Sequence, residues 1–206
     1  RGNQVILNEG AVPSCKGYLG FPASVCVSIN EEVVHGIPGE RVLREGDIVS
    51  MDLGAIYKGY QGDASVTVGV GQVDDGARRL MAVTFGALWA GIFQAMPGNR
   101  LGDISWAIQE YAESRGYSVV REYVGHGIGQ KMHEPPQIPN FGQAGPGPVL
   151  EAGMTFALEP MVNEGDYLTK VKEDGWTVVT RDGKLSAHFE HTIAITENGP
   201  QVLTKL

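Results

Sequence analysis

The stretch LREGDIVSMD at residues 43–52 is echoed by LEAGMTFALE at residues 150–159. Both begin with leucine, carry a glycine three positions later, and end an apolar-rich run on an acid, Asp52 or Glu159. Packing alone gives no reason for an acid at the end of a buried strand, because burying an unpaired carboxylate is costly in free energy. Two such strands indicate a duplicated scaffold that aims two acids at one place, and they predict a cation site.

The echo extends to either side of these two stretches. The chain returns after the first one as DASVTV from Asp63, and after the second one as EHTIAI from Glu190. Upstream, the tripeptide His-Gly-Ile occurs at residues 35–37 and again at residues 126–128. Chance could produce any single match. Three matches in the same order favour two related halves, each with an acid on an outgoing strand and another at the start of a returning strand.

Length and charge limit the kind of protein. The chain has 206 residues, enough for one sizeable core in a single domain or in two tightly fused halves. Its net charge is −8 without any run of Lys or Arg, which argues against nucleic acid or an anionic membrane as the main partner. The sequence has no apolar stretch of transmembrane length, no signal peptide, and only two cysteines. We therefore expect a reduced, cytoplasmic setting.

Hydrophobic periodicity and turn residues predict an α+β fold. We expect a strand at 25–30, a hairpin with arms 47–57 and 63–70, helices at 74–96 and 104–115, and further strands at 118–124, 154–163, 176–181 and 188–196. The Pro/Gly-rich residues 134–148 are expected to form a loop. This pattern predicts helices packed on one face of a curved antiparallel sheet.

The first hairpin brings two acids together. A turn centred on Tyr57-Lys58 would place Asp52 directly opposite Asp63. Facing like charges destabilise a hairpin by roughly 0.2–1 kcal/mol on an exposed face, so we expect a divalent cation to neutralise them. Two alternatives stay open: the acids could be solvated beside a loop, or the glycines that follow the turn could introduce a bulge and break this register.

One histidine and four acids in mirrored positions form a candidate ligand set: Asp52, Asp63, His126, Glu159 and Glu190. An oxygen-rich set with one imidazole suits two divalent first-row ions better than a closed thiolate-rich zinc site. Two ions held close together can share a water, lower its pKa and orient it as a nucleophile. Each residue alone has a plainer interpretation, as a turn histidine, a strand-end acid or an acid on an exposed strand. A serine hydrolase is not indicated, because the sequence has no Gly-x-Ser-x-Gly elbow.

Several longer segments resemble type I methionine aminopeptidases of the bacterial type. These are SVCVSINEEVVHGIP from Ser24, GHGIG from Gly125, FALEPMV from Phe156, DGWTV from Asp174 and FEHT from Phe189. The resemblance spans essentially the whole chain, and the combination is highly specific. It implies the pseudo-two-fold "pita-bread" α+β fold, with one catalytic domain over residues 1–206 and approximate halves 1–117 and 118–206.

The resemblance also implies a role for each site residue. The four acids and the histidine above would hold two divalent metal ions, which could be cobalt, manganese, iron or zinc. Asp63 and Glu190 would bridge the ions, Asp52 would hold one of them, and His126 with Glu159 would hold the other. Glu159 would double as a proton shuttle. His133 would contact the scissile amide and His35 the substrate, although both would be ordinary loop histidines in a metal-free interpretation.

A pocket for a methionine side chain is implied as well, at Cys15, Tyr18, Phe21, Cys26 and Trp176. These residues offer a soft, apolar surface that suits a thioether. Plain core packing is the alternative, above all for Cys26. Phe21 stands where a tyrosine is frequent in the family, and Met132 where a phenylalanine is frequent. Both keep the pocket apolar, so we expect the methionine preference to survive with a changed affinity.

The implied activity is removal of the initiator methionine from nascent polypeptides with a small second residue, by a monomer in the cytoplasm that could act at the ribosome. An X-Pro aminopeptidase or prolidase of the same fold, or a non-catalytic binding module, are alternatives. The family ordinarily carries a further N-terminal helical segment, and this chain begins after it. Lower stability or dependence on a partner piece is therefore expected.

Overall fold

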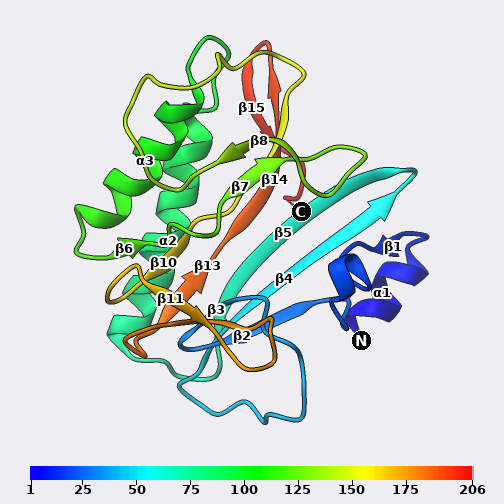
Figure 1. Ribbon diagram of the computed structural model, residues 1–206, viewed down its shortest axis with the longest axis vertical. Helices are drawn as coiled ribbons and strands as arrows, with labels where there is room; N and C mark the ends of the chain where they lie inside the picture. The colour runs from blue at the N-terminus through cyan, green and yellow to red at the C-terminus, as the bar shows by residue number, and fades with distance from the viewer. Residues whose placement is uncertain (206) are drawn as a thin grey trace.

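A curled antiparallel sheet organises the computed structural model, which describes residues 1–205 (Figure 1). The order of its strands is β1 (Val12–Pro13), β4 (Ile48–Tyr57), β5 (Tyr60–Gly69), β14 (Glu190–Thr196), β9 (Thr155–Leu158), β7 (Gly125–Gly127) and β8 (Glu134–Ile138). Two more strands pair outside this path, β2 (Cys26–Ile29) with β4 and β15 (Gly199–Val202) with β14. The predicted curved antiparallel sheet is confirmed.

The order of the strands is symmetric about the central pair, β5 and β14. On one side β4 and then β2 follow, and on the other side β9 and then β7. β4, which contains Asp52, and β9, which is followed directly by Glu159, therefore take equivalent positions. This order is the pseudo-two-fold arrangement that the internal echo predicted.

Two small three-stranded sheets flank the large one. The first contains β6 (Ser118–Val119), β10 (Met161–Asn163) and β13 (Ser186–His188), with β10 in the middle. The second contains β3 (Glu32–Val34), β11 (Thr169–Val171) and β12 (Val178–Thr180), with β12 in the middle. The hairpin of β11 and β12 matters for the site, because residues 172–177 connect its two strands.

Two long helices, α2 (Asp75–Gln94) and α3 (Leu101–Glu113), lie together on one side of the sheet, whereas the short α1 (Gly2–Asn8) lies beside β1 at its far end (Figure 1). α2 begins where the Asp74 side chain accepts a hydrogen bond from the amide of Ala77 at 2.7 Å, which caps the helix. The main core lies between the helices and the sheet and includes Leu80, Ile104 and Phe156. Within residues 1–205, no helix is both long and apolar enough to cross a membrane.

The hairpin register differs from the prediction. Asp52 pairs with Ser65, whereas Asp63 pairs with Gly54, so the two acids do not face each other. The two turn residues are Lys58 and Gly59, with φ of 50° and 85°. Positive φ at both central residues is the geometry of a two-residue hairpin turn that matches the twist of the strands. The turn is thus one residue later than Tyr57-Lys58, and the predicted opposition of the two acids is wrong.

Two other boundaries differ as well. The predicted strand 154–163 is split into β9 and β10, which belong to different sheets, and Glu159 and Pro160 lie between them. Proline has no amide hydrogen for a ladder, so the break falls there. Residues 134–148 were expected to form a loop, but their first part is the edge strand β8. Its two prolines are tolerated because an edge strand leaves amide positions unpaired.

Candidate metal centre

Four adjacent strands, β4, β5, β14 and β9, place three predicted ligands in one row across the sheet. Asp52 on β4 pairs with Ser65 on β5, and Ser65 pairs with Glu190 on β14. Glu159 follows the last residue of β9 and continues the row on the other side of Glu190. Residues paired in this way share a face of the sheet, so the row collects three carboxyl groups on one surface.

A second row lies two residues farther along the same strands. Asp63 is held against β14 by Thr192, whose hydroxyl accepts from the Asp63 amide at 2.9 Å and donates to its carbonyl at 2.8 Å. Thr192 pairs with Ala157 on β9, which pairs with His126 on β7. Because side chains alternate with a period of two, this row projects from the same face as the first.

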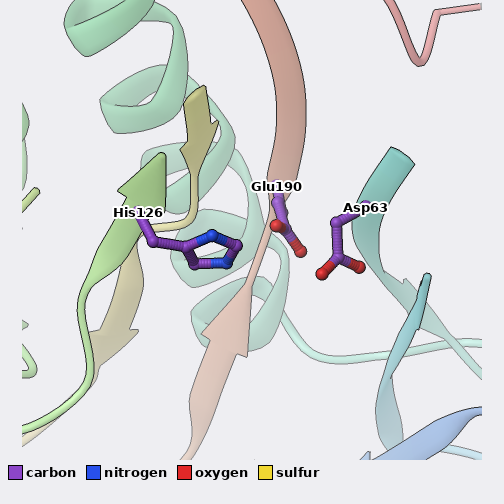
Figure 2. Close-up of side chains that lie close together, drawn as sticks. All are labelled: Asp63, His126 and Glu190. Carbon is purple, nitrogen blue, oxygen red and sulfur yellow. The ribbon is translucent and has the colours of Figure 1, made fainter. Parts of the chain in front are cut away.

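The two rows converge on one point. Ligand atoms of Asp63, His126 and Glu190 all lie within 4.8 Å of one another, and the three side chains point toward a common space (Figure 2). Nε2 of His126 is 3.4 Å from Oε1 of Glu159. The group borders a cavity of about 170 Å³ that Asp52 and Glu159 also line.

Glycines make room for the ligands. A Cβ at Gly54, opposite Asp63, would come within 2.8 Å of Ser14 and within 3.3 Å of the Asp63 carboxylate. Beside His126, a Cβ at Gly125 would approach the Ala157 carbonyl oxygen to 2.5 Å. His126 is therefore not a turn residue between flexible glycines. It lies on a buried strand that can pack closely against β9 only without side chains at its flanks.

Burial strongly disfavours charge on the four acids. It raises the pKa of Asp52 and Glu159, and neighbouring carboxylates raise them further, Asp63 for both and Asp52 for Glu159. The pKa of Glu190 is raised by burial and then by Asp63 and Glu159. Burial raises the pKa of Asp63 to about 7, although a hydrogen bond from the Ala64 amide opposes the shift. Four clustered carboxylates would repel one another once they are ionised.

His126 is neutral, and one of its ring nitrogens is available to a metal. Burial and the nearby His133 together lower the pKa of His126 to about 4, although a hydrogen bond to the Gly127 carbonyl opposes the shift. Nδ1 of His126 lies 2.9 Å from that carbonyl oxygen, so the proton belongs on Nδ1 and the lone pair on Nε2. Nε2 is the atom that faces Glu159.

These observations fit a divalent cation. Oε1 of Glu190 is buried and has no hydrogen-bond partner within the described part of the chain. An orphaned carboxylate oxygen, three further acids with raised pKa values and a neutral imidazole nitrogen are what a divalent metal ion would satisfy. The group can therefore hold metal.

Two more histidines border the same space. The hydroxyl of Tyr18 lies 2.7 Å from Nδ1 of His133, and the His133 ring is 4.3 Å from the ring of His126. His35 stands edge-on to Tyr123 at 5.6 Å and has a φ of 58°, unusual for a residue other than glycine. Burial lowers the pKa of both histidines, and His133 lowers that of His35 further. Both are therefore neutral hydrogen-bonding groups near pH 7.

An apolar recess adjoins the ligands. Cys15, Phe21 and Cys26 form a buried cluster, against which Met132 and Trp176 pack. Phe21 and Trp176 meet edge to face with ring centroids 5.1 Å apart. This recess is a part of the cavity wall, so its residues are not only core packing.

All twelve residues expected at the site line this cavity, together with Met132 and Leu19. Leu19 was not predicted, and it is 81% exposed at a φ of 48° in the short helix Tyr18–Gly20. Thr192 and Tyr123 also escaped the sequence analysis. The segment FEHT, which ends on Thr192, carried a signal for the first, whereas nothing in the sequence places Tyr123 beside His35.

Comparison with known proteins adds an independent observation. The model of metallopeptidase family M24 matches residues 3–197. The chain is 58% identical over 200 residues to a methionine aminopeptidase of Clostridium acetobutylicum, which covers 97% of this chain and 80% of that protein. It is 56% identical over 201 residues to methionine aminopeptidase 1 of Bacillus subtilis, covering 98% of this chain and 81% of that protein. The crystal structure of methionine aminopeptidase from Thermotoga maritima superimposes with a TM-score of 0.97 at 55% identity, over 98% of this chain and 82% of that one.

Proposed function

The chain belongs to metallopeptidase family M24, and we propose that it removes the N-terminal methionine from polypeptides whose second residue is small. The relatives named methionine aminopeptidase support this activity, because they are more than half identical over nearly the whole chain. The observation that carries the proposal is the apolar recess directly beside the cluster of acids, since it pairs a thioether-sized pocket with a metal-binding group.

We propose two divalent ions at the cluster. Asp63 and Glu190 would bridge them, Asp52 would bind one, and His126 with Glu159 would bind the other. When bound, such ions lower the pKa of a shared water and polarise the scissile carbonyl. Cobalt, manganese, iron and zinc ions all accept this set of ligands.

The remaining chemistry belongs to side chains of the chain. Glu159, whose pKa burial raises, would hold the proton that the attacking water gives up and return it to the nitrogen of the leaving peptide. His133, neutral and oriented by its hydrogen bond with Tyr18, would donate to the scissile amide and stabilise the developing negative charge. His35 would contact the substrate from the opposite wall, beside Trp176.

The recess would hold the methionine side chain. Its sulfur-bearing and aromatic walls, from Cys15, Cys26, Phe21, Tyr18 and Trp176, favour a soft, unbranched group through dispersion and sulfur–aromatic contacts. With this recess beside the reacting bond, the rest of the polypeptide would extend toward the mouth of the cavity. The substrates would be the N-termini of nascent chains, with the ribosome as the place of encounter. We further propose a cytoplasmic monomer whose halves meet between residues 117 and 118.

A peptide assay tests the function directly. The protein is stripped with a chelator, reloaded with Mn²⁺ or Co²⁺, and supplied with a Met-Ala peptide and an Ala-Pro peptide in parallel. Release of methionine that requires the metal and far exceeds release of alanine is expected. Preference for Ala-Pro would identify a prolidase-type activity instead, and no turnover of either peptide by a metal-loaded protein would indicate a binding module. The variant Asp63→Asn, which loses a bridging anion, should abolish turnover, and near-normal activity would sink the assignment of that residue.

A further inference from the structure

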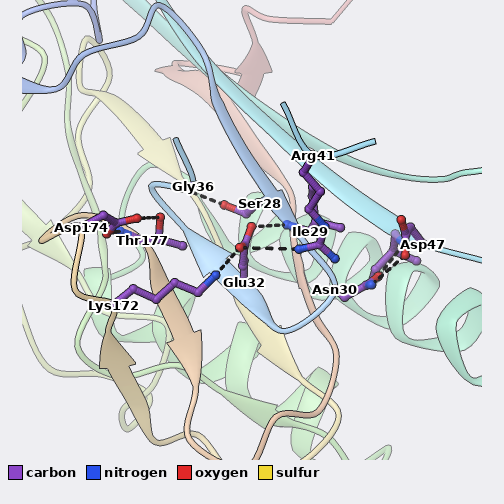
Figure 3. A network of polar contacts seen from close by, with 11 residues as sticks. Ser28, Ile29, Asn30, Glu32, Gly36, Arg41, Asp47, Lys172, Asp174 and Thr177 are labelled. Carbon is purple, nitrogen blue, oxygen red and sulfur yellow. Dashed lines mark hydrogen bonds and ion pairs between the residues drawn. The ribbon is translucent and has the colours of Figure 1, made fainter. Parts of the chain in front are cut away.

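A buried carboxylate outside the metal cluster joins three segments of the chain. Glu32 on β3 is 8% exposed (Figure 3). Its Oε2 accepts from the amide of Ile29 at 2.9 Å, and its Oε1 lies 2.6 Å from Nζ of Lys172 and 3.8 Å from Nη1 of Arg41. Because burying an unpaired carboxylate is costly, a residue at this position needs the partners that it has.

Lys172 begins a turn that is braced from within. We call residues 172–177, which connect β11 to β12, the pocket turn. The Lys172 amide donates to the Thr177 carbonyl at 2.8 Å. The Asp174 carboxylate accepts from the amides of Trp176 and Thr177, at 2.9 and 2.8 Å, and from the Thr177 hydroxyl at 2.6 Å (Figure 3). These bonds make the pocket turn a rigid unit, so a force that holds Lys172 also holds Trp176.

The tip of the pocket turn forms a wall of the substrate cavity. Trp176 meets Phe21 at 5.1 Å and lies 6.4 Å from the His35 ring, both edge to face. His35 itself follows β3, the strand that carries Glu32. Glu32 is therefore connected to both of these cavity residues. The backbone of β3 leads from Glu32 to His35, and the ion pair with Lys172 links Glu32 to the pocket turn that carries Trp176.

Backbone pairing alone attaches this hairpin weakly. β12 pairs with β3 at only two positions, Val178 with Val34 and Val179 with Glu32, and the register shifts between them. On its other side β12 pairs only with β11, whose residues Lys170 and Val171 are exposed. Beyond these two pairs, the Thr180 amide donates to the Glu31 carbonyl at 2.9 Å. The register shift makes this short ladder irregular, and the ion pair between Glu32 and Lys172 adds a side-chain link between β3 and the hairpin.

We propose that Glu32 is a positioning residue for substrate selectivity, which holds the pocket turn through Lys172 so that Trp176 closes the recess for the first side chain of the substrate. The inference rests on the proposed function and deepens it. Glu32 touches neither the metal cluster nor the cavity, and it acts through the position of Trp176. Loss of the ion pair should therefore weaken binding and selectivity and leave the chemical step intact.

The test variant removes the positive charge of Lys172 and keeps an unbranched apolar side chain. In Lys172→Met, KM for a Met-Ala peptide should rise about tenfold with kcat within about twofold, and the preference for Met-Ala over Leu-Ala should fall about tenfold, in the range that a misfitted apolar pocket produces. Lys170→Met is the matched control on the same hairpin and should behave as wild type. Lys172→Arg, which keeps the positive charge, should retain the wild-type KM, kcat and peptide preference. Glu32→Gln should mimic Lys172→Met, and the double variant should be no worse than the worse single one, since both changes remove the same interaction.

A second measurement does not depend on turnover. Hydrogen exchange at the amides of Trp176 and Thr177 should become about tenfold faster in Lys172→Met and stay unchanged in Lys170→Met, because the pocket turn would open more often. Equal selectivity and exchange in the two variants would overturn the proposal, as would a lower kcat at an unchanged KM. Wild-type protein that releases no methionine under metal-loaded conditions would refute the function itself, an outcome that differs from either of these.

Discussion

At the scale of single residues, the candidate site is a group of buried acids whose burial raises their pKa values. Asp63 shows this most clearly, because burial raises its pKa to about 7. In the metal-free protein, folded Asp63 keeps its proton up to about that pH, whereas the unfolded residue loses it near 4. The folded state then binds more protons than the unfolded state between these values, so Asp63 stabilises the protein at low pH and ceases to do so as pH rises.

This predicts a pH-dependent difference between wild type and Asp63→Asn. In chelator, the unfolding free energy of the wild type relative to the variant should fall between about pH 4 and pH 7, by at most about 1.4 kcal/mol per pH unit. Urea unfolding of both proteins across this range measures it. A difference that stays constant, or grows as pH rises, would show that Asp63 is already ionised when it folds.

His133 offers a prediction about chemistry alone. His133→Ala should lower kcat by about 10²-fold, the usual loss when one donor to a developing oxyanion is removed. Metal affinity should hold, because His133 is not one of the ligands proposed here. Steady-state kinetics with a parallel Mn²⁺ titration separates the two effects. Tyr18→Phe, which keeps the ring and removes only the hydroxyl partner of His133, should give a smaller loss; a drop in metal affinity for His133→Ala would assign that ring to the metal.

The sequence predicted the residues that line the cavity, but not their arrangement. Mirrored acids and a shared His-Gly-Ile indicated the candidate ligands, and the family resemblance indicated the candidate pocket residues. The predicted hairpin turn lay one residue too early in the sequence. The local sequence around Lys58 and Gly59 permits either turn, and only the long ladder between β4 and β5 decides between them. Asp52 and Asp63 are diagonal neighbours on the paired strands β4 and β5, because Asp52 pairs with Ser65, two residues from Asp63.

At the scale of elements, the ladder between β5 and β14 lies at the centre of the sheet and carries Asp63 and Glu190, the two acids proposed to bridge the ions. Only two residue pairs form this ladder, Glu190 with Ser65 and His191 with Ala64. The hydroxyl of Thr192 extends it with two hydrogen bonds to the Asp63 backbone. We expect Thr192 to stabilise the contact between β5 and β14, since both of its hydrogen bonds to Asp63 are buried.

Thr192→Val should therefore cost about 1–3 kcal/mol, because it leaves the amide and the carbonyl of Asp63 unpaired in the interior while it preserves shape. Chemical denaturation of the metal-free protein measures the cost. Thr192→Ser keeps the hydroxyl and is the control, expected to lose much less. A Val variant as stable as the wild type would mean that water or a neighbouring group takes over both bonds.

Element types were largely predictable and element partners were not. The helices α2 and α3 agree with the periodicity of their apolar positions, and the long hairpin agrees with its β-branched content. The split of residues 154–163 into strands of two sheets was missed, although Pro160 marked the position. This break has a function in the fold, since it frees Glu159 from the ladder and leaves its carboxyl group beside Glu190.

At the scale of the whole molecule, the symmetric order of the strands explains how side chains from both parts of the chain converge on one point. The cost is a set of mutually repelling acids, which a bound cation would offset. Metal should then stabilise the folded state strongly. At a free metal concentration of 100 times the Kd, mass action gives about 2.7 kcal/mol per site, which corresponds to roughly 5–10 °C in Tm for a chain of this length.

Thermal unfolding with chelator and with Mn²⁺ checks this expectation. The Tm of wild type should rise with metal concentration, and that of Asp63→Asn should rise much less. A variant of a surface acid far from the site, Asp75→Asn, should respond as wild type. Equal metal responses in the wild type and Asp63→Asn would mean that the ions bind elsewhere on this acidic chain.

An anomalous difference map shows directly whether five residues from the two halves hold a pair of metal ions. Crystals grown with millimolar Mn²⁺ should show two peaks in the space that Asp63, His126 and Glu190 enclose, one nearer to Asp52 and the other nearer to His126 and Glu159. A single peak, or peaks bound by His35 and His133 in place of these ligands, would contradict the account.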